Sequence, residues 1–257
     1  MLVFSLAFEH LTKNSMTKLN RTSLEAAKER LHWRGATLDE LTRISWFEVL
    51  TPDEQARAAK ELVVGTVQAG ASVCRVGRPA TFWFGVLEGL LKVSSEDQDG
   101  TPVTFVGVTS GSWFGEGTVL KREPYRYNVQ ALCTSVVAGL PLEDFHWLLE
   151  HSTGFNRFVI FQLNERLGQF VAAREIESAN RPDLRVARSL AAMFNPVLNP
   201  KADMSLRVTQ QELGYLVGLS RQRVNQALSA LQARGAIQIE YGGLRILDLE
   251  ALRTELF

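Results

Sequence analysis

The 257-residue chain contains 46% hydrophobic and 22% charged residues, which is typical of a globular protein and excludes a disordered one. Its 28 basic and 28 acidic residues cancel, so any surface for nucleic acid must be local. No apolar run is long enough to span a membrane, and the opening MLVFSLAF lacks the basic start and the small-residue cleavage site of a signal peptide. We therefore expect a cytoplasmic protein without membrane contact, and Met16 is an alternative start to Met1.

Cysteine and histidine usage argues against a metal site or a disulfide framework. Cys74 and Cys133 form no CxxC pair, and none of the four histidines belongs to an HxxH or HExxH pattern. No cysteine precedes Cys74, so an N-terminal iron–sulfur cluster is not expected. Haem stays open, although no Cys-x-His pair supports it. The chain also lacks GxSxG, P-loop and GxGxxG motifs, so we expect no enzymatic activity.

The first 150 residues divide into an arm and a strand-rich zone. We assign residues 1–40 to an N-terminal arm that is partly helical, with TSLEAAKERLHW as its best helix. Residues 41–150 contain short runs rich in Val, Phe and Thr, separated by turn signals such as EDQDG and TSGSW. The runs are ASVCRV, TFWFGVLEGLLKVSS, TPVTFVGV and NVQALCTSVVAGL. This pattern predicts an antiparallel β-sandwich or β-roll.

A long helix is expected within residues 151–180. The segments LEDFHWLLEHS and GFNRFVIFQLNERLGQFVAAREIESAN follow Pro141, and Pro182 should end the second one and mark a hinge. The second segment has a broad apolar surface, and a helix with such a surface must pack against two other elements. A core helix and a dimerisation helix both fit, and composition alone does not choose between them. Apolar side chains recur at steps of three and four at Phe155, Phe158, Val159, Leu163, Leu167, Phe170 and Val171.

The C-terminal segment, residues 181–257, has ten Lys and Arg against seven Asp and Glu, a mild basic excess. Its stretch VTQQELGYLVGLSRQRVNQALSAL carries the signals of two helices joined by a tight turn. Thr209 and Glu212 form a capping box for the first helix. Gly218 suits the left-handed end of that helix, and Ser220 can cap the second. The expected buried side chains are Leu213, Leu216, Val217, Val224, Leu228 and Leu231.

The other face of the second helix carries polar side chains that can read bases, because Arg donates two bonds to guanine and Asn or Gln bonds adenine in a bidentate way. Two β-type runs, Ile237–Tyr241 and Leu244–Leu247, then flank Gly242-Gly243, which predicts a hairpin that serves as a wing. The alternative is a solvated face on an ordinary helical hairpin. The coincidence of caps, turn glycine and wing favours DNA binding. The polar side chains are Arg221, Gln222, Asn225, Gln226 and Ser229.

The stretch TQQELGYLVGLSRQRVNQAL is very similar to the helix-turn-helix signature of the CRP/FNR superfamily of bacterial transcription regulators. WFEVLTPDEQ, VLEGLLKV and DGTPVTFVGVTSGSWFGEG resemble successive parts of that family's N-terminal β-roll. The resemblance covers roughly residues 40–255. It implies an α+β protein with an N-terminal antiparallel, cyclic-nucleotide-binding-like β-roll, a long dimerisation helix and a C-terminal winged helix-turn-helix domain.

The resemblance also implies partners and contacts. It implies a homodimer that binds double-stranded DNA at an inverted-repeat site and works with RNA polymerase. The family commonly has Glu where this chain has Gln222 and often Arg where it has Gln226, so the DNA site should differ from the best-known family consensus. The implied dimer contacts are Phe158, Leu163, Leu167 and Phe170. The implied DNA contacts are Thr209, Gln211, Ser220, Arg221, Gln222, Asn225 and Gln226.

An effector pocket is implied in the roll, where this chain departs from the family pattern. Cyclic-nucleotide binders carry a cassette that begins Gly-Glu and ends with Arg, then Ser or Thr, then Ala. Its glutamate holds the ribose hydroxyl and its arginine holds the phosphate. Gly115 and Glu116 match the start. Counting forward from Glu116 puts Arg126 on the arginine position, but counting back from Ala131 puts Tyr125 there, so the cassette is one residue short.

Tyr127 stands where the cassette has a small hydroxyl residue, and a bulky phenol there can fill the phosphate seat. A cyclic nucleotide is therefore not the expected effector. Arg126 has a structural alternative, an ion pair with a carboxylate such as Glu123. The expected function is a homodimeric, effector-responsive DNA-binding transcription regulator. The alternative is a nucleotide-binding regulatory subunit of an enzyme or transporter, whose C-terminal helices mediate assembly.

Overall fold

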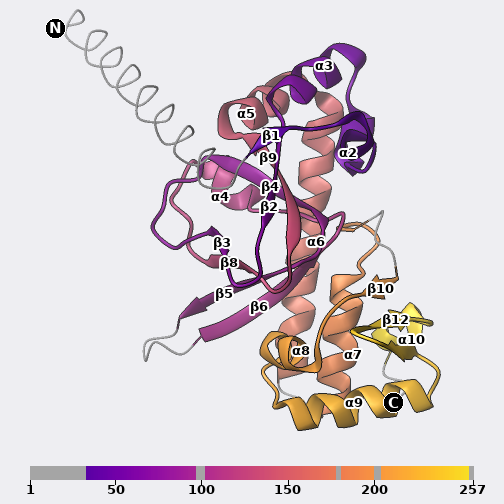
Figure 1. Cartoon of the computed structure of the whole chain (residues 1–257). Coiled ribbons are helices and arrows are strands. Elements are labelled where there is room, and N and C mark those ends of the chain that lie inside the picture. The colour runs from indigo at the N-terminus through magenta and orange to yellow at the C-terminus, as the bar shows by residue number, and fades with distance from the viewer. Residues whose placement is uncertain (1–32, 97–101, 178–180, 200–203, 255–257) are drawn as a thin grey trace, which may run out of the picture.

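The computed structural model of the protein describes residues 33–96, 102–177, 181–199 and 204–254. The predicted helix TSLEAAKERLHW lies outside these residues except for Trp33. A strand-rich roll and a C-terminal domain sit at different heights along one long helix, α6 (Thr153–Glu177), as Figure 1 shows.

Two antiparallel sheets form the predicted β-roll, with strand orders β1-β2-β9-β4-β7 and β3-β8-β5-β6. The first sheet contains β1 (Arg34–Gly35), β2 (Val63–Val67), β9 (Ser135–Pro141), β4 (Phe82–Glu88) and β7 (Trp113–Phe114). The second contains β3 (Ser72–Cys74), β8 (Asn128–Ala131), β5 (Leu90–Glu96) and β6 (Pro102–Thr109). The run TFWFGVLEGLLKVSS therefore forms two strands, one in each sheet.

Short helices cover the end of the roll that lies away from the C-terminal domain (Figure 1). They are α2 (Leu38–Thr42), the 3-10 helix η1 (Ser45–Val49), α3 (Pro52–Glu61) and α5 (Leu142–His151), while α4 (Glu116–Lys121) lies on the side of the roll. The sheet itself begins before the expected limit at residue 41, because Arg34 and Gly35 of β1 pair with β2.

The first sheet buries aromatic side chains on both of its faces. Those between the two sheets are Phe82, Phe84, Phe114 and Tyr125. Those between the sheet and the helices are Trp46, Trp83, Trp113, Phe145 and Phe155. Full burial of one such side chain contributes about 1.5–3 kcal/mol. Because Phe155 belongs to α6, this second group fixes the N-terminal half of α6 to the roll.

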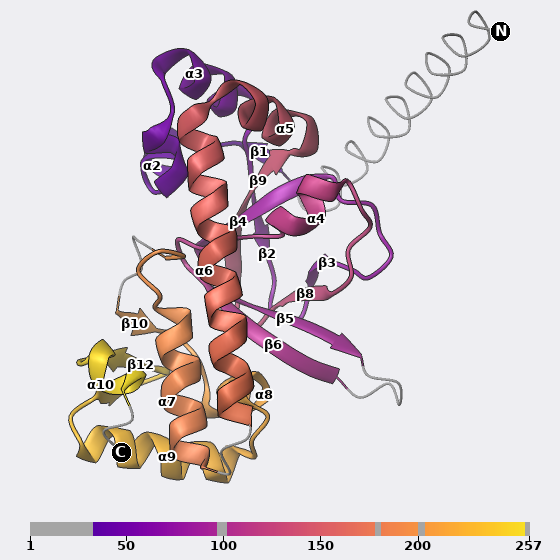
Figure 2. The same ribbon diagram turned by 180° about the vertical axis from the view of Figure 1, so that it is seen from behind.

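The apolar stripe predicted for α6 divides between an inner and an outer face. Phe158 and Leu163 are half-buried against the roll's core, so only part of each is available to a partner. Within the described residues, no helix has both the length and the apolar character needed to cross a membrane. The large apolar side chains of α6 that are 57–68% exposed are Ile160, Phe161, Leu167, Phe170 and Val171. Figure 2 shows this helix from behind, on the outside of the roll.

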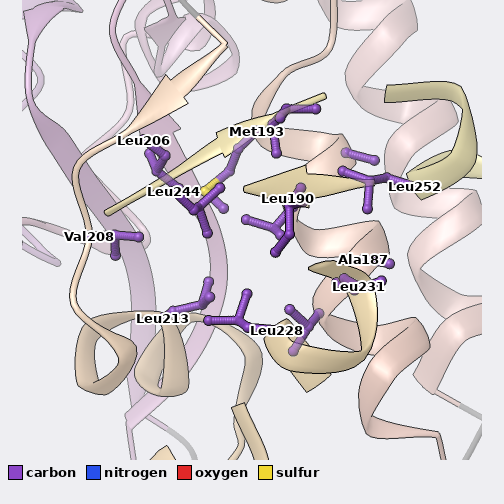
Figure 3. Packing of buried hydrophobic residues seen from close by; sticks show 14 of the residues in the cluster. Ala187, Leu190, Met193, Leu206, Val208, Leu213, Leu228, Leu231, Leu244 and Leu252 are labelled. Carbon is purple, nitrogen blue, oxygen red and sulfur yellow. The ribbon is translucent and has the colours of Figure 1, made fainter. Parts of the chain in front are cut away.

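The C-terminal segment forms the predicted winged helix-turn-helix. Its elements are α7 (Pro182–Met193), β10 (Ser205–Leu206), α8 (Gln210–Val217), α9 (Arg221–Ala233), β11 (Ile237–Glu240), β12 (Gly243–Ile246) and α10 (Leu249–Arg253). Every side chain expected to be buried in α8 and α9 lies in one apolar cluster. Figure 3 shows Leu213, Leu228 and Leu231 arranged around Leu190 of α7.

The wing turns one residue earlier than predicted. Glu240 pairs with Gly243, so the turn residues are Tyr241 and Gly242 rather than the two glycines. Gly242 adopts the left-handed φ of 73° that the turn requires. Gly243 instead admits a third strand, β10, because a Cβ on Gly243 would collide with the carbonyl oxygen of Leu206. The sequence did not predict this strand.

The C-terminal domain docks against the roll through β6. A Cβ on Gly107 of β6 would stand 2.6 Å from Sδ of Met193 in α7 and 3.5 Å from Leu216 in α8. The Thr109 hydroxyl donates to the Met193 carbonyl at 3.0 Å. Leu90 of β5 belongs to the same buried cluster as the C-terminal domain. The roll therefore contributes to the apolar core of the C-terminal domain.

Candidate nucleic-acid interface and effector pocket

Local capping positions both helices of the helix-turn-helix as predicted. The Thr209 N–H donates to Glu212 Oε2 at 2.7 Å, and the Glu212 N–H donates to Thr209 Oγ1 at 3.2 Å. Gly218 ends α8 with φ 65°, where an L residue with a side chain would cost about 1–2 kcal/mol. Ser220 Oγ then accepts from the Arg223 N–H at 3.4 Å and begins α9. These caps set the angle at which α9 leaves α8.

The polar side chains of α9 face solvent, away from the buried Val224, Leu228 and Leu231. In Figure 1, α9 lies across the end of the molecule opposite the short helices of the roll. The exposed side chains of α9 include Arg221, Gln222, Asn225, Gln226 and Ser229. The other predicted DNA contacts, Thr209, Gln211 and Ser220, are exposed at the starts of α8 and α9.

A groove of about 470 Å³ separates the start of α8 and α9 from the wing. Thr209, Gln211 and Arg221 line it from the helices, and Glu240 and Gly242 line it from the wing. The structure therefore brings the wing beside predicted DNA contacts of both helices, as a winged helix-turn-helix requires.

Gln210 is a polar residue of this surface that the sequence did not single out. Its Nε2 donates to Asn225 Oδ1 at 2.9 Å. The two residues are fifteen positions apart and belong to different helices, so no local spacing signals the contact. Only the angle between α8 and α9 creates it.

In the roll, Glu116 at the predicted start of the effector cassette forms an ion pair with the long helix α6. Glu116 is 2% exposed, and its Oε1 forms an ion pair with Nε of Arg166 in α6. Arg166 also donates to the carbonyl oxygen of Trp113. Glu116 Oε2 is buried and has no hydrogen-bond partner among the described residues. The carboxylate that would hold a ribose hydroxyl therefore already holds α6, a contact the sequence did not predict.

The predicted phosphate site contains phenols, and the arginine that the cassette would place there, Arg126, faces away from it. The Arg126 side chain is 74% exposed and pairs with Glu123 at 2.8 Å, which is the structural alternative considered for it. Tyr125 is 5% exposed and donates to the Phe82 carbonyl at 3.1 Å. The Tyr127 hydroxyl lies 3.4 Å from where a Cβ on Gly115 would stand, so it covers the start of the cassette.

Burial keeps these groups neutral. It raises the pKa of Tyr127 to about 12 and holds the pKa of Tyr125 well above its ordinary value. Burial also raises the pKa of the Cys74 thiol, which is a free cysteine, as is Cys133. Among the described residues, no three His, Cys, Asp or Glu side chains gather as metal ligands would. The roll's interior thus offers aromatic faces and hydroxyls where a nucleotide phosphate would need a cation.

Comparison with known proteins finds a family match for the β-roll and another for the C-terminal domain. The cyclic nucleotide-binding domain family matches residues 64–152, and the Crp-like helix-turn-helix domain family matches residues 184–255. The chain belongs to the CRP/FNR family of transcription regulators. It is therefore a DNA-binding transcriptional regulator rather than an enzyme, and the alternative of a regulatory subunit with C-terminal assembly helices is wrong.

Individual relatives of this CRP/FNR regulator extend over most of its length. The cAMP-activated global transcriptional regulator CRP of Haemophilus influenzae is 25% identical over 77% of this chain and 93% of its own. Transcriptional regulator SdrP of Thermus thermophilus is 28% identical over 66% of this chain and 81% of its own. The c-di-GMP responsive global regulator CLP of Xanthomonas campestris shares the fold, with a TM-score of 0.53 and 21% identity over 76% of this chain and 99% of its own.

Proposed function

We propose that this CRP/FNR regulator is a homodimer that reads an inverted-repeat DNA site through α9. The observation that supports it is the division of α9 into two faces. One face is buried in the domain core, and the other exposes two arginine and three amide side chains within Arg221–Gln226. Such a helix fits the major groove, where these side chain types discriminate between base pairs.

The outer face of α6 supports the homodimer. Phe161, Leu167 and Phe170 are each more than 60% exposed on one helix, which is unusual for a surface that stays in water. A second copy packed in antiparallel or parallel fashion against this face would bury it. We propose this exposed face as the main dimer contact, with Phe158 and Leu163 contributing only the parts that the roll leaves uncovered. Two recognition helices would then meet half-sites about 34 Å apart.

We propose that this protein does not respond to a cyclic nucleotide. Arg126 points into solvent with Glu123, Glu116 is paired with Arg166, and Tyr127 covers Gly115. A phosphate in an enclosed pocket needs a fixed cation, and this pocket offers none where the cassette would place it. The aromatic interior suits an apolar or aromatic molecule, or it closes the roll so that the protein binds DNA without an effector.

The remaining partners follow from the proposed role. A dimeric regulator on a promoter contacts RNA polymerase, and we place this protein in the cytoplasm with the DNA that it reads. The CRP protein of Haemophilus influenzae is cAMP-activated and the CLP protein of Xanthomonas campestris is c-di-GMP responsive, so relatives with this fold differ in their effectors.

Selection from random DNA tests the DNA-binding proposal. The full chain should enrich an inverted repeat, with retention that falls as salt rises because phosphate contacts release counterions. Arg221→Ala should weaken specific binding by about 1–3 kcal/mol and relax the preference at one base pair of each half-site. An unchanged selected motif in Arg221→Ala would contradict the role given to this residue, and a single half-site as the selected motif would contradict the dimer.

Calorimetry and DNA binding with cyclic AMP and cyclic GMP test the effector proposal. Either nucleotide should change DNA affinity less than about tenfold, which corresponds to roughly 1.4 kcal/mol of coupling. Micromolar binding that Arg126→Ala abolishes, together with a large gain in DNA affinity, would show that Arg126 occupies the phosphate seat and that the proposal is wrong.

A further inference from the structure

The contact between Gln210 and Asn225 joins the two helices on the surface that faces DNA. Gln210 is the first residue of α8 and Asn225 lies in the second turn of α9. Gln210 is partly buried and Asn225 is exposed. The start of α8 is held by the capping box of Thr209 and Glu212, so Gln210 approaches Asn225 from a fixed position. The hydrogen bond runs from Nε2 of Gln210 to Oδ1 of Asn225, at 2.9 Å.

This bond has a direction, and the direction matters for base reading. An asparagine side chain offers one carbonyl acceptor and one NH₂ donor at opposite ends of the same amide. Bidentate recognition of adenine needs both ends at the base edge, with Oδ1 accepting from N6 and Nδ2 donating to N7. Because Oδ1 of Asn225 faces Gln210, Nδ2 faces the other way. The outward end of this amide can therefore only donate.

We infer that Gln210 is a positioning residue that makes Asn225 a hydrogen-bond donor toward DNA and so selects guanine or thymine over adenine or cytosine at the base that Asn225 meets. This rests on the proposed function. Guanine presents two acceptors, N7 and O6, in the major groove and thymine presents O4, whereas the exocyclic amino groups of adenine and cytosine would meet the donor end of Asn225. Sequence alone gives the opposite expectation, since an asparagine in this place reads as an adenine contact.

Two substitutions at Gln210 test the direction of the bond. Selection with Asn225→Ala first identifies the base pair whose preference Asn225 sets, and operators carrying each base there are then compared. The wild-type chain should favour guanine over adenine by about fivefold or more. Gln210→Glu can only accept, so it should turn the Asn225 amide, place Oδ1 toward DNA, and move the preference to cytosine or adenine. Gln210→Ala releases the amide and should raise adenine relative to guanine.

Affinity ratios between operators are the readout, because the added charge of Gln210→Glu weakens all operators together and cancels in the ratio. Neither substitution should unfold α8, since alanine and glutamate are both well tolerated in a first helical turn. The matched control places Gln210→Ala in the Asn225→Ala background, where it should leave the base ratios unchanged.

Two results would overturn the inference. One is a wild-type preference for adenine at the base set by Asn225. The other is a Gln210→Ala variant that loses affinity equally for all four operators in both backgrounds, which would make Gln210 a DNA-backbone contact only. Failure of the wild-type chain to select any motif would instead contradict the proposed function itself, so the two failures are distinguishable.

Discussion

Replacement of Arg166 by methionine should destabilise the protein severely. Methionine keeps much of the apolar length of arginine but carries no charge. In Arg166→Met, Glu116 would lose its ion-pair partner while its side chain stays 3% exposed, and the Trp113 carbonyl would lose its donor. A buried charge left without its partner costs about 3–5 kcal/mol. Because the Arg166 side chain is itself 25% exposed, water can partly replace it, and we expect a loss near the lower end, about 3 kcal/mol.

Chemical and thermal unfolding of the full chain measure this loss. For a protein of this size each kcal/mol shifts the Tm by about 2–4 °C, so Arg166→Met should unfold roughly 6–12 °C below the wild type. Glu116→Gln alone should cost less, because the arginine that remains can reach water. The double variant, Glu116→Gln with Arg166→Met, removes the orphaned charge and should be more stable than Arg166→Met by about 1–2 kcal/mol.

The reasoning would be refuted by either of two results. If Arg166→Met unfolds within about 1 kcal/mol of the wild type, the buried carboxylate does not depend on the guanidinium. If the double variant is no more stable than Arg166→Met, the loss comes from packing of the arginine stem and not from the charge.

Three further outcomes follow from other contacts. Leu167→Lys places a charge on the exposed face of α6 and should shift sedimentation toward the monomer while each protomer stays folded, since Leu167 is 64% exposed within one chain. Gly107→Val overlaps the Met193 thioether and should cost about 1–3 kcal/mol of unfolding free energy, part of which a Met193→Ala second change should restore. The Arg34 hydrogen bond lowers the pKa of Glu40 to about 2, below its ordinary 4.5, so this pair stabilises the fold above pH 4.5 and the contribution is lost as pH falls toward 2. Glu40→Gln should therefore lower the Tm at pH 7, and the difference from the wild type should shrink between pH 5 and pH 3.

Each of these three predictions would be contradicted by a specific result. Leu38→Lys, at a still more exposed leucine on α2, is the control for the dimer, and monomers in both variants would argue against α6 as the contact. Full stability of Gly107→Val would contradict the tight contact inferred between Gly107 and Met193. A Glu40→Gln difference that stays constant from pH 7 to pH 3 would contradict the pKa shift.

The helix-turn-helix could be predicted from the sequence because its determinants are local. A capping box spans four residues, a left-handed glycine acts at one position, and Ser220 caps the helix that it precedes. The exposed side chains of α9 then follow from the helical period. The ion pair of Arg126 with Glu123, three residues apart, is also local and was among the alternatives that the sequence suggested.

Contacts between distant segments could not be predicted. Arg166 and Glu116 are fifty positions apart, and nothing in either neighbourhood marks the other as its partner. Strands β1 and β10 have two residues each, too short for an alternating pattern to appear. The wing turn was misplaced by one residue because both glycines suit a turn, and only the approach of β10 shows that Gly243 is needed for another reason.

The docking of Met193 on Gly107 also determines how this regulator could be recombined with its relatives. A chimaera joined between α6 and α7 would replace the surface against which the roll packs, since Leu90 of the roll lies among residues of the C-terminal domain and Gly107 faces Met193. A transplanted DNA-binding domain would bring its own side chain to the place of Met193, while the roll would still present a bare glycine. Exchange of DNA-binding domains between such proteins therefore requires that the facing stretch of β6 be exchanged with them. Substitution of the exposed side chains of α9 can change the DNA specificity without disturbing this contact.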